Sequence, residues 1–582
     1  MSAIALYSSL GSAATVATAN AGSFKPKRMS DCASGAGDDS QDALKPLWPT
    51  FNYFPHQLEG IRWMLDKERN GTLVPGKKSE QVLVRGGMQC DEMGLGKTIQ
   101  IVATILNNPL PLTVLLAPVA MIETWTSVCQ RAGLIVYHAV GPDWFLLPNV
   151  NAPVTPTATA TATVYLTNSE KIYTTPRLFR HLPIDRVVID EAHKLRNPSG
   201  QMAIYARRLG PPGTIRWAVT GTPLVNKWED VISLLAFIGV PYSPLFHWEQ
   251  RYEDMLPSLV LHRSLESIRS SLPAPPYPII QHIALPFTSQ EEEEFYFAIQ
   301  GNVLSQATGS SVPSSYDMDR LTPQQTFLLL LRLRQISVHP QIYISAKRRE
   351  SPSYLRANWI GPSTKLLAIR DIILQDFLQE QTLPLQQQEQ EPHKYIIFCQ
   401  FMEEIELIQD YLLSLDLFLP QNILQYHGSM TMLQRDTVLQ YSKRSLEPTV
   451  LLLQLHAGGV GLNLQEYDRI LFVSPWWTSA LIDQAIARAV RMGQTRVVHV
   501  YHLLLQVEQE QSQEQSQEQE QEQEQRSPIS IDALIHSKAE EKREMLAHFF
   551  HICHPLHEEE DEDDDLEELQ EEEEEELQED EC

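Results

Sequence analysis

Short apolar runs alternate with amphipathic segments along two stretches of the chain. In the first stretch, from about Phe51 to Gly239, the runs are Val82–Arg85, Thr113–Ala117, Val164–Thr167, Arg186–Ile189 and Arg216–Thr220. In the second, from about Lys394 to Leu505, they are Tyr395–Phe398, Asn422–Tyr426, Thr449–Leu453, Arg469–Val473 and Val497–His502. Short β-branched runs between helices are typical of parallel sheets. The pattern predicts an α/β protein with two parallel-sheet lobes and one cleft between them.

Shifts in composition divide the rest of the chain. Tracts made of Ala, Ser and Thr, or of Glu and Gln, cannot bury enough apolar surface to order themselves. We therefore predict a disordered start (1–45), a first lobe (46–240), a helical bridging region (241–378), a Gln-rich linker (379–392), a second lobe (393–507), a Glu/Gln-rich insertion (508–527), a C-terminal helix (528–557) and an acidic disordered tail (558–582).

The net charge of -28 over 582 residues comes largely from the tail, where 19 of 25 residues are acidic. Nucleic-acid binding is therefore not excluded by composition, because it depends on where the basic residues cluster. No apolar run is long enough to cross a membrane, and the first 20 residues lack the features of a secretory signal. Six scattered cysteines without a CxxC pair predict neither a disulfide scaffold nor a zinc site.

The first chemical motif is CDEMGLGKT at residues 90–98, which enters a predicted helix. A glycine-rich turn at a helix start exposes backbone N–H groups to phosphate oxygens. Lys97 would reach the β- and γ-phosphates, and the Thr98 hydroxyl would ligate Mg²⁺. Asp91 stands where the strict pattern has its first glycine, so a plain glycine-rich turn is the alternative. The candidate nucleotide-binding residues are Asp91, Glu92, Met93, Gly94, Leu95, Gly96, Lys97 and Thr98.

The second motif is VVIDEAH at residues 187–193. Asp190 ends an apolar strand, where a Mg²⁺-binding carboxylate belongs. Glu191 beside it could polarise the attacking water as a general base. The alternative is an acidic pair on the surface, which the expected position of Lys97 on the same sheet argues against. Thr98 and Asp190 are thus the predicted metal ligands.

The third motif is QAIARAVR at residues 484–491. Helical spacing would put Gln484, Arg488 and Arg491 on one face. From the second lobe, these guanidinium groups could reach the γ-phosphate across the cleft as arginine fingers. A basic helix face that pairs with acidic groups is the alternative. The predicted catalytic set is Lys97, Asp190, Glu191, Arg488 and Arg491.

Together, the motifs resemble the helicase superfamily-two ATPases of the SWI/SNF type, and within them the subgroup of DNA-damage-tolerance translocases and helicase-like transcription factor. The resemblance spans roughly Phe51–Leu505. Residues 54–63 (FPHQLEGIRW) resemble the adenine-recognising segment, which would place Gln57 on the base. Residues 115–118 (LLAP), with Trp125 following, resemble the first DNA-tracking motif, and residues 217–226 (WAVTGTPLVN) resemble the motif that couples hydrolysis to lobe movement.

In the second lobe, residues 397–401, 427–430, 457–464 and 474–477 are similar to family segments. The resemblance implies two RecA-like lobes that use ATP and Mg²⁺ to translocate along double-stranded DNA, usually without strand separation. It also implies a nuclear location, a role in DNA repair or chromatin remodelling, and nucleosomes or repair factors as further partners. The residues that would contact DNA are Pro118, Trp125, Thr167, Gly459 and Asn463.

The sequence departs from the family pattern at a few positions. Ala487 replaces an acidic residue before the first arginine, Val490 replaces a histidine before the second, and His262 replaces one arginine of a pair. These changes bear on the coupling of hydrolysis to movement rather than on nucleotide binding. The subgroup often carries a RING finger between its lobes, but no cysteine lies between Arg131 and Phe398, so we expect no ubiquitin-ligase activity.

Several features leave alternatives open. The C-terminal cluster of His548, His551, Cys553, His554 and His557 could bind a metal, but we expect the end of a helix there. The tetrad KPKR at residues 25–28 is either a nuclear import signal or a solvated basic patch. Two other functions remain possible from the sequence: a strand-separating DNA or RNA helicase, and a non-hydrolysing DNA-bound scaffold.

Overall fold

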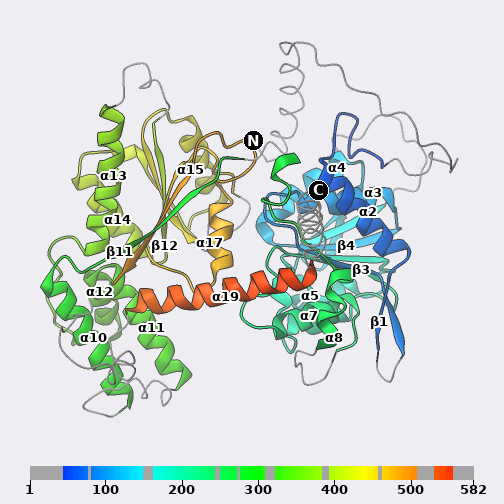
Figure 1. Ribbon diagram of the computed structural model, residues 1–582, viewed down its shortest axis with the longest axis horizontal. Helices are drawn as coiled ribbons and strands as arrows, with labels where there is room; N and C mark the ends of the chain where they lie inside the picture. The colour runs from blue at the N-terminus through cyan, green and yellow to red at the C-terminus, as the bar shows by residue number, and fades with distance from the viewer. Residues whose placement is uncertain are drawn as a thin grey trace, which may run out of the picture.

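The computed structural model describes residues 44–76, 80–148, 162–242, 250–271, 275–308, 322–382, 392–455, 462–506 and 530–554. These residues form two α/β lobes that lie side by side (Figure 1). The Glu/Gln-rich insertion, the acidic tail, and all but the ends of the predicted disordered start and Gln-rich linker lie outside the described residues.

Lobe 1 is built on an eight-stranded sheet with the strand order β10-β3-β9-β8-β4-β7-β5-β6. Neighbouring strands run parallel except in the β5–β6 hairpin. The strands are β3 (Gly86–Gln89), β4 (Leu112–Ala117), β5 (Ile135–Val140), β6 (Asp143–Leu146), β7 (Thr163–Asn168), β8 (Arg186–Asp190), β9 (Ile215–Val219) and β10 (Val260–Leu261). In a parallel sheet, the loops after the strands gather at one edge, where ligands bind.

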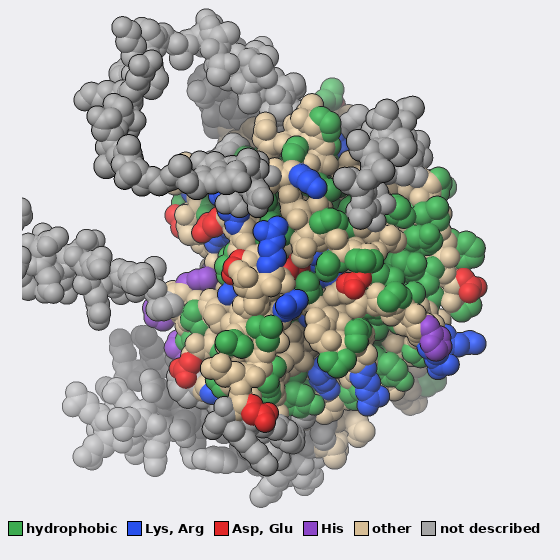
Figure 2. All heavy atoms as spheres, turned by 90° about the vertical axis from the view of Figure 1, so that its right-hand side faces the viewer, with side chains coloured by type: hydrophobic (Ala, Val, Ile, Leu, Met, Phe, Trp, Pro, Cys, Tyr) green, Lys and Arg blue, Asp and Glu red, His purple; other side chains and the backbone are tan. Residues whose placement is uncertain are grey.

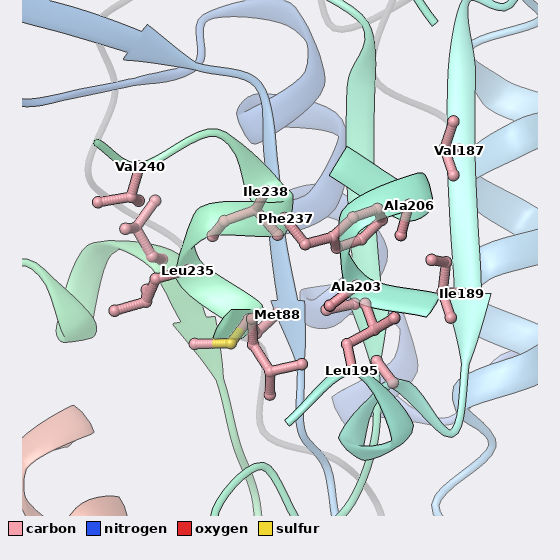
Figure 3. Close-up of a cluster of buried hydrophobic side chains, with 14 of the residues drawn as sticks. Met88, Val187, Ile189, Leu195, Ala203, Ala206, Leu235, Phe237, Ile238 and Val240 are labelled. Atoms are coloured by element: carbon pink, nitrogen blue, oxygen red, sulfur yellow. The ribbon is translucent and has the colours of Figure 1, made fainter. Parts of the chain in front are cut away.

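Helices cover both faces of the lobe 1 sheet. One face carries α2 (Pro55–Arg69), α3 (Lys97–Asn107) and α4 (Ile122–Arg131). The other carries α6 (Gln201–Arg207) and α7 (Glu229–Ile238), whose apolar side chains pack against Met88, Val187 and Ile189 of the sheet (Figure 3). Shorter helices are α5 (Lys171–Thr174), α8 (Gln250–Glu253) and α9 (Leu256–Leu259). Strands β8 and β4 are buried along their whole length, as expected for a sheet covered on both sides.

Lobe 2 is built on a six-stranded, all-parallel sheet with the order β11-β16-β15-β12-β14-β13. Its strands are β11 (Ile279–Leu285), β12 (Lys394–Cys399), β13 (Ile423–Tyr426), β14 (Thr449–Gln454), β15 (Arg469–Phe472) and β16 (His499–Leu505). α13 (Thr364–Thr382) and α14 (Met402–Ser414) pack on one face, and α15 (Met432–Arg444) and α17 (Ser479–Ile486) on the other. The predicted fold class, two parallel-sheet lobes, is confirmed.

The region between the lobes contributes to both sheets. Strand β10 extends the lobe 1 sheet, and β11 extends the lobe 2 sheet. Three helices, α10 (Gln290–Thr308), α11 (Pro323–Val338) and α12 (Pro340–Glu350), form a helical group with its own buried apolar cluster. In its first half, the predicted bridging region therefore contributes one strand to each sheet, and from α10 onward its described elements are helices.

The long helix α19 (Ile531–Cys553) spans both lobes (Figure 1). At its start, Asp532 lies 2.5 Å from the ammonium nitrogen of Lys365, and both side chains are almost fully buried. At its end, Phe549 is buried in the lobe 1 core, and the Phe550 ring stacks on His262 with ring centroids 3.5 Å apart. One helix therefore packs on both lobes.

The segment predicted as the buried sheet strand Val82–Arg85 is a strand, but it does not belong to the main sheet and is largely exposed. Most of it belongs to β2 (Gln81–Val84), which forms an antiparallel hairpin with β1 (Thr72–Pro75) away from the main sheet. The sheet strand is the next segment, β3, whose four residues are all buried. The sequence pattern does not predict β3, because the strand begins with two glycines and glycine is depleted in strands.

On the described surface of lobe 1, side chains of several kinds are mixed in the view of Figure 2. Figure 2 shows Lys and Arg side chains in small groups over the lobe 1 end of the molecule, interleaved with hydrophobic and acidic side chains. Within the described residues, no helix combines the length and apolar character that a membrane span requires.

Candidate active site between the lobes

The loop between β3 and α3 has the backbone shape expected of a phosphate-binding turn. Gly94 and Gly96 adopt left-handed conformations, with φ of +89° and +82°. A side chain at Gly96 would also collide, because its Cβ would lie 2.6 Å from the Gln57 amide nitrogen. The loop thus needs glycine at residue 96 for both its conformation and its packing, and it turns directly into the first residue of α3, Lys97.

Helix α2 holds this loop from behind. The His56 ring nitrogen Nε2 lies 2.9 Å from the Leu95 carbonyl oxygen, and the Gln57 amide donates to the same oxygen at 3.4 Å. Gln57 is fully buried. Gln57 does not line the cavity described below and contacts the loop, and its contact with a nucleotide base stays a prediction.

Lys97 closes the loop on itself. Its ammonium group donates to the carbonyl oxygens of Asp91 (2.7 Å) and Glu92 (3.2 Å). The Asp91 side chain is buried and does not line the cavity either. Of the predicted nucleotide-binding residues, the cavity is lined by Met93, Gly94, Gly96, Lys97 and Thr98.

The acidic pair lies at the end of β8. The Trp125 indole donates to Asp190 Oδ2 at 2.8 Å, and the Glu191 backbone N–H donates to Oδ1 at 3.0 Å. Burial, together with the neighbouring charge of Glu191, raises the pKa of Asp190 to about 6. A nearby cation such as Mg²⁺ would favour the ionised form again.

Glu191 occupies a strained backbone position, with φ of +52°. Its carboxylate lies 3.3 Å from His193 Nδ1, which is also 3.2 Å from the Thr220 hydroxyl in the predicted coupling motif. Burial alone would raise the pKa of Glu191, but the bond from His193 and the positive charges of Lys97 and Arg488 lower it overall. The carboxylate is therefore kept ionised, as a proton acceptor must be.

The two arginines do not lie on a helix face, and that prediction is wrong. Helix α17 ends at Ile486, and Arg488 and Arg491 follow it on a tight turn. The Arg488 carbonyl accepts a bond from the Leu464 N–H (3.0 Å), which ties this turn to the segment before β15. Gln484 stays within α17, is buried and does not line the cavity.

One cavity of about 190 Å³ brings these groups together. Lobe 1 lines it with the phosphate loop, Asp190, Glu191 and Gly221, and lobe 2 lines it with Ala487, Arg488 and Arg491. Burial and the charge of Arg491 lower the pKa of Arg488, while Glu191 and Asp190 oppose this shift. Cationic and anionic walls from different lobes therefore face one another.

The cavity lining also includes a mostly apolar group of residues. These are Trp48, Met121, Thr124 and Val128. The Arg131 guanidinium lies 3.9 Å from the centroid of the Trp48 ring and braces it. Sequence reasoning missed Trp48, because a tryptophan nine residues before Gln57 belongs to no recognisable motif.

Most of the residues predicted to contact DNA are buried or lie outside the described residues. Trp125 is fully buried and Thr167 is almost so, which makes both side chains unavailable to DNA. Pro118 is also buried, and Gly459 lies outside the described residues. Asn463 is partly exposed, and its Oδ1 has no hydrogen-bond partner within the described part of the chain.

The C-terminal histidines do not converge on a point. His548 packs edge-on against Trp228, and His554 Nε2 accepts a bond from the His262 N–H. Among the described residues, no group of three or more His, Cys, Asp or Glu side chains is arranged to hold a metal ion. His557 lies outside them.

Comparison with known proteins covers most of the chain. Residues 56–342 match the SNF2-related domain, and residues 373–493 match the helicase conserved C-terminal domain. A viral protein of Orgyia pseudotsugata multicapsid polyhedrosis virus, named "Probable global transactivator", is 26% identical over 81% of this chain and 90% of its own length. The DNA repair protein RAD5 of Yarrowia lipolytica is 23% identical, over 81% of this chain and 58% of its own length.

The ATP-dependent DNA helicase DDM1 of Arabidopsis thaliana is 24% identical over 80% of this chain. The chain spans about three fifths of the length of these two cellular relatives. Among solved structures, the Sulfolobus solfataricus SWI2/SNF2 ATPase core in complex with dsDNA is 19% identical, with 80% of this chain and 90% of that chain covered and a TM-score of 0.32. With both family domains present in order, the chain belongs to the SNF2-related family of helicase-like, DNA-dependent ATPases.

Proposed function

We propose that this chain hydrolyses ATP in the cavity between its lobes and uses the resulting lobe movement to translocate along double-stranded DNA. The observation that carries the proposal is the composition of one cavity. Lys97, Asp190 and Glu191 line it from one lobe, and Arg488 and Arg491 line it from the other. These are the parts that phosphoryl transfer requires: a phosphate cradle, carboxylates and cations on both sides of the γ-phosphate.

In this proposal, the phosphate loop binds the triphosphate. Lys97 exchanges its bonds to the Asp91 and Glu92 carbonyls for bonds to phosphate oxygens. Thr98 and Asp190 would hold Mg²⁺, because a hydroxyl and a carboxylate are the hard oxygen ligands that this ion prefers. When bound, the ion would neutralise charge on the phosphates.

Glu191 would accept the proton of the attacking water. Its lowered pKa keeps it ionised near neutral pH, and His193 fixes its carboxylate. The same His193 ring lies beside the Thr220 hydroxyl, which accepts a bond from the Thr222 N–H. A change in the charge or position of the Glu191 carboxylate would therefore be passed through His193 to residues 220–222.

Arg488 and Arg491 would stabilise the negative charge that develops on the γ-phosphate. Loss of that phosphate would remove what attracts the two lobes across the cavity. Hydrolysis is thereby connected to separation of the lobes.

The base would pack against the apolar part of the cavity lining. Trp48, Met121 and Val128 offer it flat and apolar surface, and Thr124 adds a hydroxyl. Sites for cofactor-sized ligands combine an apolar lining with a few polar groups in this way.

Double-stranded DNA is proposed as the partner because relatives named for DNA repair and DNA helicase activity cover four fifths of this chain. Ser169, which directly follows β7, has a buried side-chain hydroxyl without a hydrogen-bond partner among the described residues. After a lobe movement, this hydroxyl could donate to a DNA phosphate oxygen. A nuclear location and a role on nucleosomes or with repair factors complete the proposal.

The experiment measures ATP turnover by the full chain with duplex DNA, single-stranded DNA, nucleosomes and RNA, each with Mg²⁺. We expect duplex DNA to raise the rate, and the stimulation to weaken as salt rises, because phosphate contacts release counterions. Lys97→Ala should abolish turnover in every arm.

Two further assays separate the alternatives. Displacement of a triplex strand without unwinding of a short duplex supports translocation, whereas unwinding indicates a strand-separating helicase. Binding of DNA without any ATP turnover would indicate a scaffold. Full turnover by Lys97→Ala would contradict the site itself.

A further inference from the structure

An arginine outside the cavity holds the phosphate loop in place. Arg263 follows β10, two residues beyond its end, at the edge of the lobe 1 sheet. Its Nε and Nη2 atoms lie 3.0 Å and 2.6 Å from the two carboxylate oxygens of Asp91. This is a two-pronged ion pair, the strongest geometry available between these groups.

Asp91 connects this pair to the cavity. Its side chain is fully buried and bound to Arg263, while its backbone carbonyl accepts the bond from Lys97 at 2.7 Å. One residue therefore links a guanidinium outside the cavity to the ammonium group inside it. Although burial opposes it, the bonds from Arg263, Gln100 and Gln89 lower the pKa of Asp91, so the carboxylate stays ionised.

Buried amides complete the network around this pair. Gln89 and Gln100 both donate to Asp91 Oδ2, at 2.8 Å and 2.9 Å, and Arg263 Nη2 donates to Gln100 Oε1 at 3.0 Å. The guanidinium also donates to the His56 carbonyl oxygen. The network thus joins β3, α3, β10 and α2, the elements that surround the loop.

The backbone leaves room for this network at one glycine. A Cβ at Gly60 of α2 would lie 2.0 Å from Gln100 Oε1 and 2.6 Å from Arg263 Nη2. Beyond the strand, the Arg263 carbonyl accepts from the Glu92 N–H at 2.9 Å, which fixes the loop backbone as well. Most contacts of Arg263 are therefore with residues 89–100, and the others, with His56 and Glu59, are with α2, the helix that holds the loop.

We propose that Arg263 is a positioning residue for nucleotide binding, which acts through Asp91 to hold the phosphate loop and Lys97 in their binding geometry. This inference rests on the proposed function of the cavity and adds a residue that the cavity itself does not include. A preformed loop loses little order when phosphate binds, so the benefit lies in affinity for the nucleotide rather than in the chemical step.

The test compares steady-state ATP hydrolysis by the full chain, with Mg²⁺ and duplex DNA, for wild type and Arg263→Gln. We expect KM for ATP to rise by about tenfold or more, while kcat changes by less than about threefold, because the lost interaction supports binding in ground and transition states alike. Arg263→Lys should recover part of the affinity, since an ammonium group can pair with Asp91 but cannot fork across both of its oxygens.

A matched control is available in lobe 2. Arg469 forms a similar buried, two-pronged pair with Asp376, with nitrogen–oxygen distances of 3.0 to 3.1 Å. Arg469→Gln removes the same chemistry far from the loop, so it should leave KM unchanged. If thermal melting shows that Arg263→Gln does not fold, Gln100→Met is the second variant. It removes the bonds of Gln100 to Asp91 and Arg263 and should raise KM by about threefold.

Unchanged KM in Arg263→Gln, or a fall in kcat larger than the rise in KM, would overturn the inference. The dissociation constant of ADP, measured by calorimetry, separates this failure from a failure of the proposed function. If the wild type binds ADP but does not hydrolyse ATP, the function fails while weaker ADP binding by Arg263→Gln still supports the role of Arg263.

Discussion

At the scale of single residues, the site depends on two neighbouring carboxylates in different surroundings. Asp190 is buried against Trp125, and its pKa rises to about 6 through burial and the charge of Glu191. Glu191 points to His193 and the cationic groups of the cavity, which lower its pKa against the effect of burial. Such a divergence is a common basis for giving adjacent acids different roles. Asp190 suits a metal ligand and Glu191 a base.

Glu191→Gln tests this division of roles. The amide has nearly the same size as the carboxylate but cannot accept a proton, so we expect kcat to fall by about 10²–10⁴-fold. Nucleotide binding, measured by calorimetry with ADP, should remain within about threefold of wild type. Glu123→Gln, an exposed change on α4, is the matched control and should keep full activity.

A loss of ADP binding in Glu191→Gln equal to the loss of turnover would show that Glu191 supports the loop rather than the reaction.

Residue types and spacing predicted the groups that line the cavity better than the groups behind it. Lys97, Thr98, Asp190 and Glu191 were predictable, because the chemistry itself requires those side chains. The roles predicted for Trp125 and Gln57 stay predictions: both side chains are buried, and a motif does not tell whether a side chain points to a ligand or into the core. Both turn inward and hold the groups that line the cavity.

At the scale of elements, strands with continuous buried apolar runs were predictable and strands with unusual composition were not. β4, β8, β12 and β14 are apolar and buried, so the sequence signals them. β3 begins with two glycines, and β11 has mostly exposed residues because it lies at a sheet edge. β10 has two residues, too few for any pattern. These strands owe their conformation to their neighbours in the sheet.

Helix α12 carries a pH-dependent start. The His339 ring accepts the Gln341 N–H at Nδ1 (3.0 Å), so this nitrogen must be unprotonated, and Nε2 lies 3.3 Å from the Gly361 carbonyl oxygen. Burial lowers the pKa of His339 from 6.5 to about 4. As pH falls below 6.5, the unfolded chain binds the proton that the folded chain refuses, so stability decreases until about pH 4.

We therefore expect the titration of His339 to lower the free energy of unfolding by about 2–3 kcal/mol when the pH falls from 7 to 4.5. His339→Asn keeps a capping acceptor but removes the titration. The measurement is urea unfolding at both pH values, and the wild type should lose that much more than the variant. Equal losses in the two proteins would refute the account of this cap.

Helix α19 should depend on its contacts with lobe 1. Phe549 is fully buried there, so Phe549→Ala should lower the unfolding free energy by about 3–5 kcal/mol through lost burial and a cavity. Hydrogen exchange should speed up along the C-terminal half of α19. Phe327→Ala is the control, because Phe327 on α11 is 68% exposed and its removal should change stability little. Similar stability of both variants would indicate that the end of α19 is not docked.

At the scale of the whole molecule, the candidate site exists because two lobes meet. Neither lobe contains both the phosphate loop and the turn after α17 that carries Arg488 and Arg491, here called the arginine turn. The helix α19 contacts lobe 1 at Phe549 and lobe 2 at Asp532, and its Arg543 lies 3.4 Å from Asp483 of α17, the helix that leads into the arginine turn. The contacts of α19 that hold the two lobes together therefore also help to place Arg488 and Arg491 opposite the phosphate loop.

The most direct test of this account is the kcat for ATP in the presence of duplex DNA for Arg488→Ala, with Arg444→Ala on the exposed end of α15 as the control. If lobe 2 supplies a transition-state cation across the cavity, kcat falls by about 10³-fold or more in Arg488→Ala, ADP still binds, and Arg444→Ala keeps the wild-type rate. A wild-type kcat in Arg488→Ala would contradict a catalytic site shared by the two lobes.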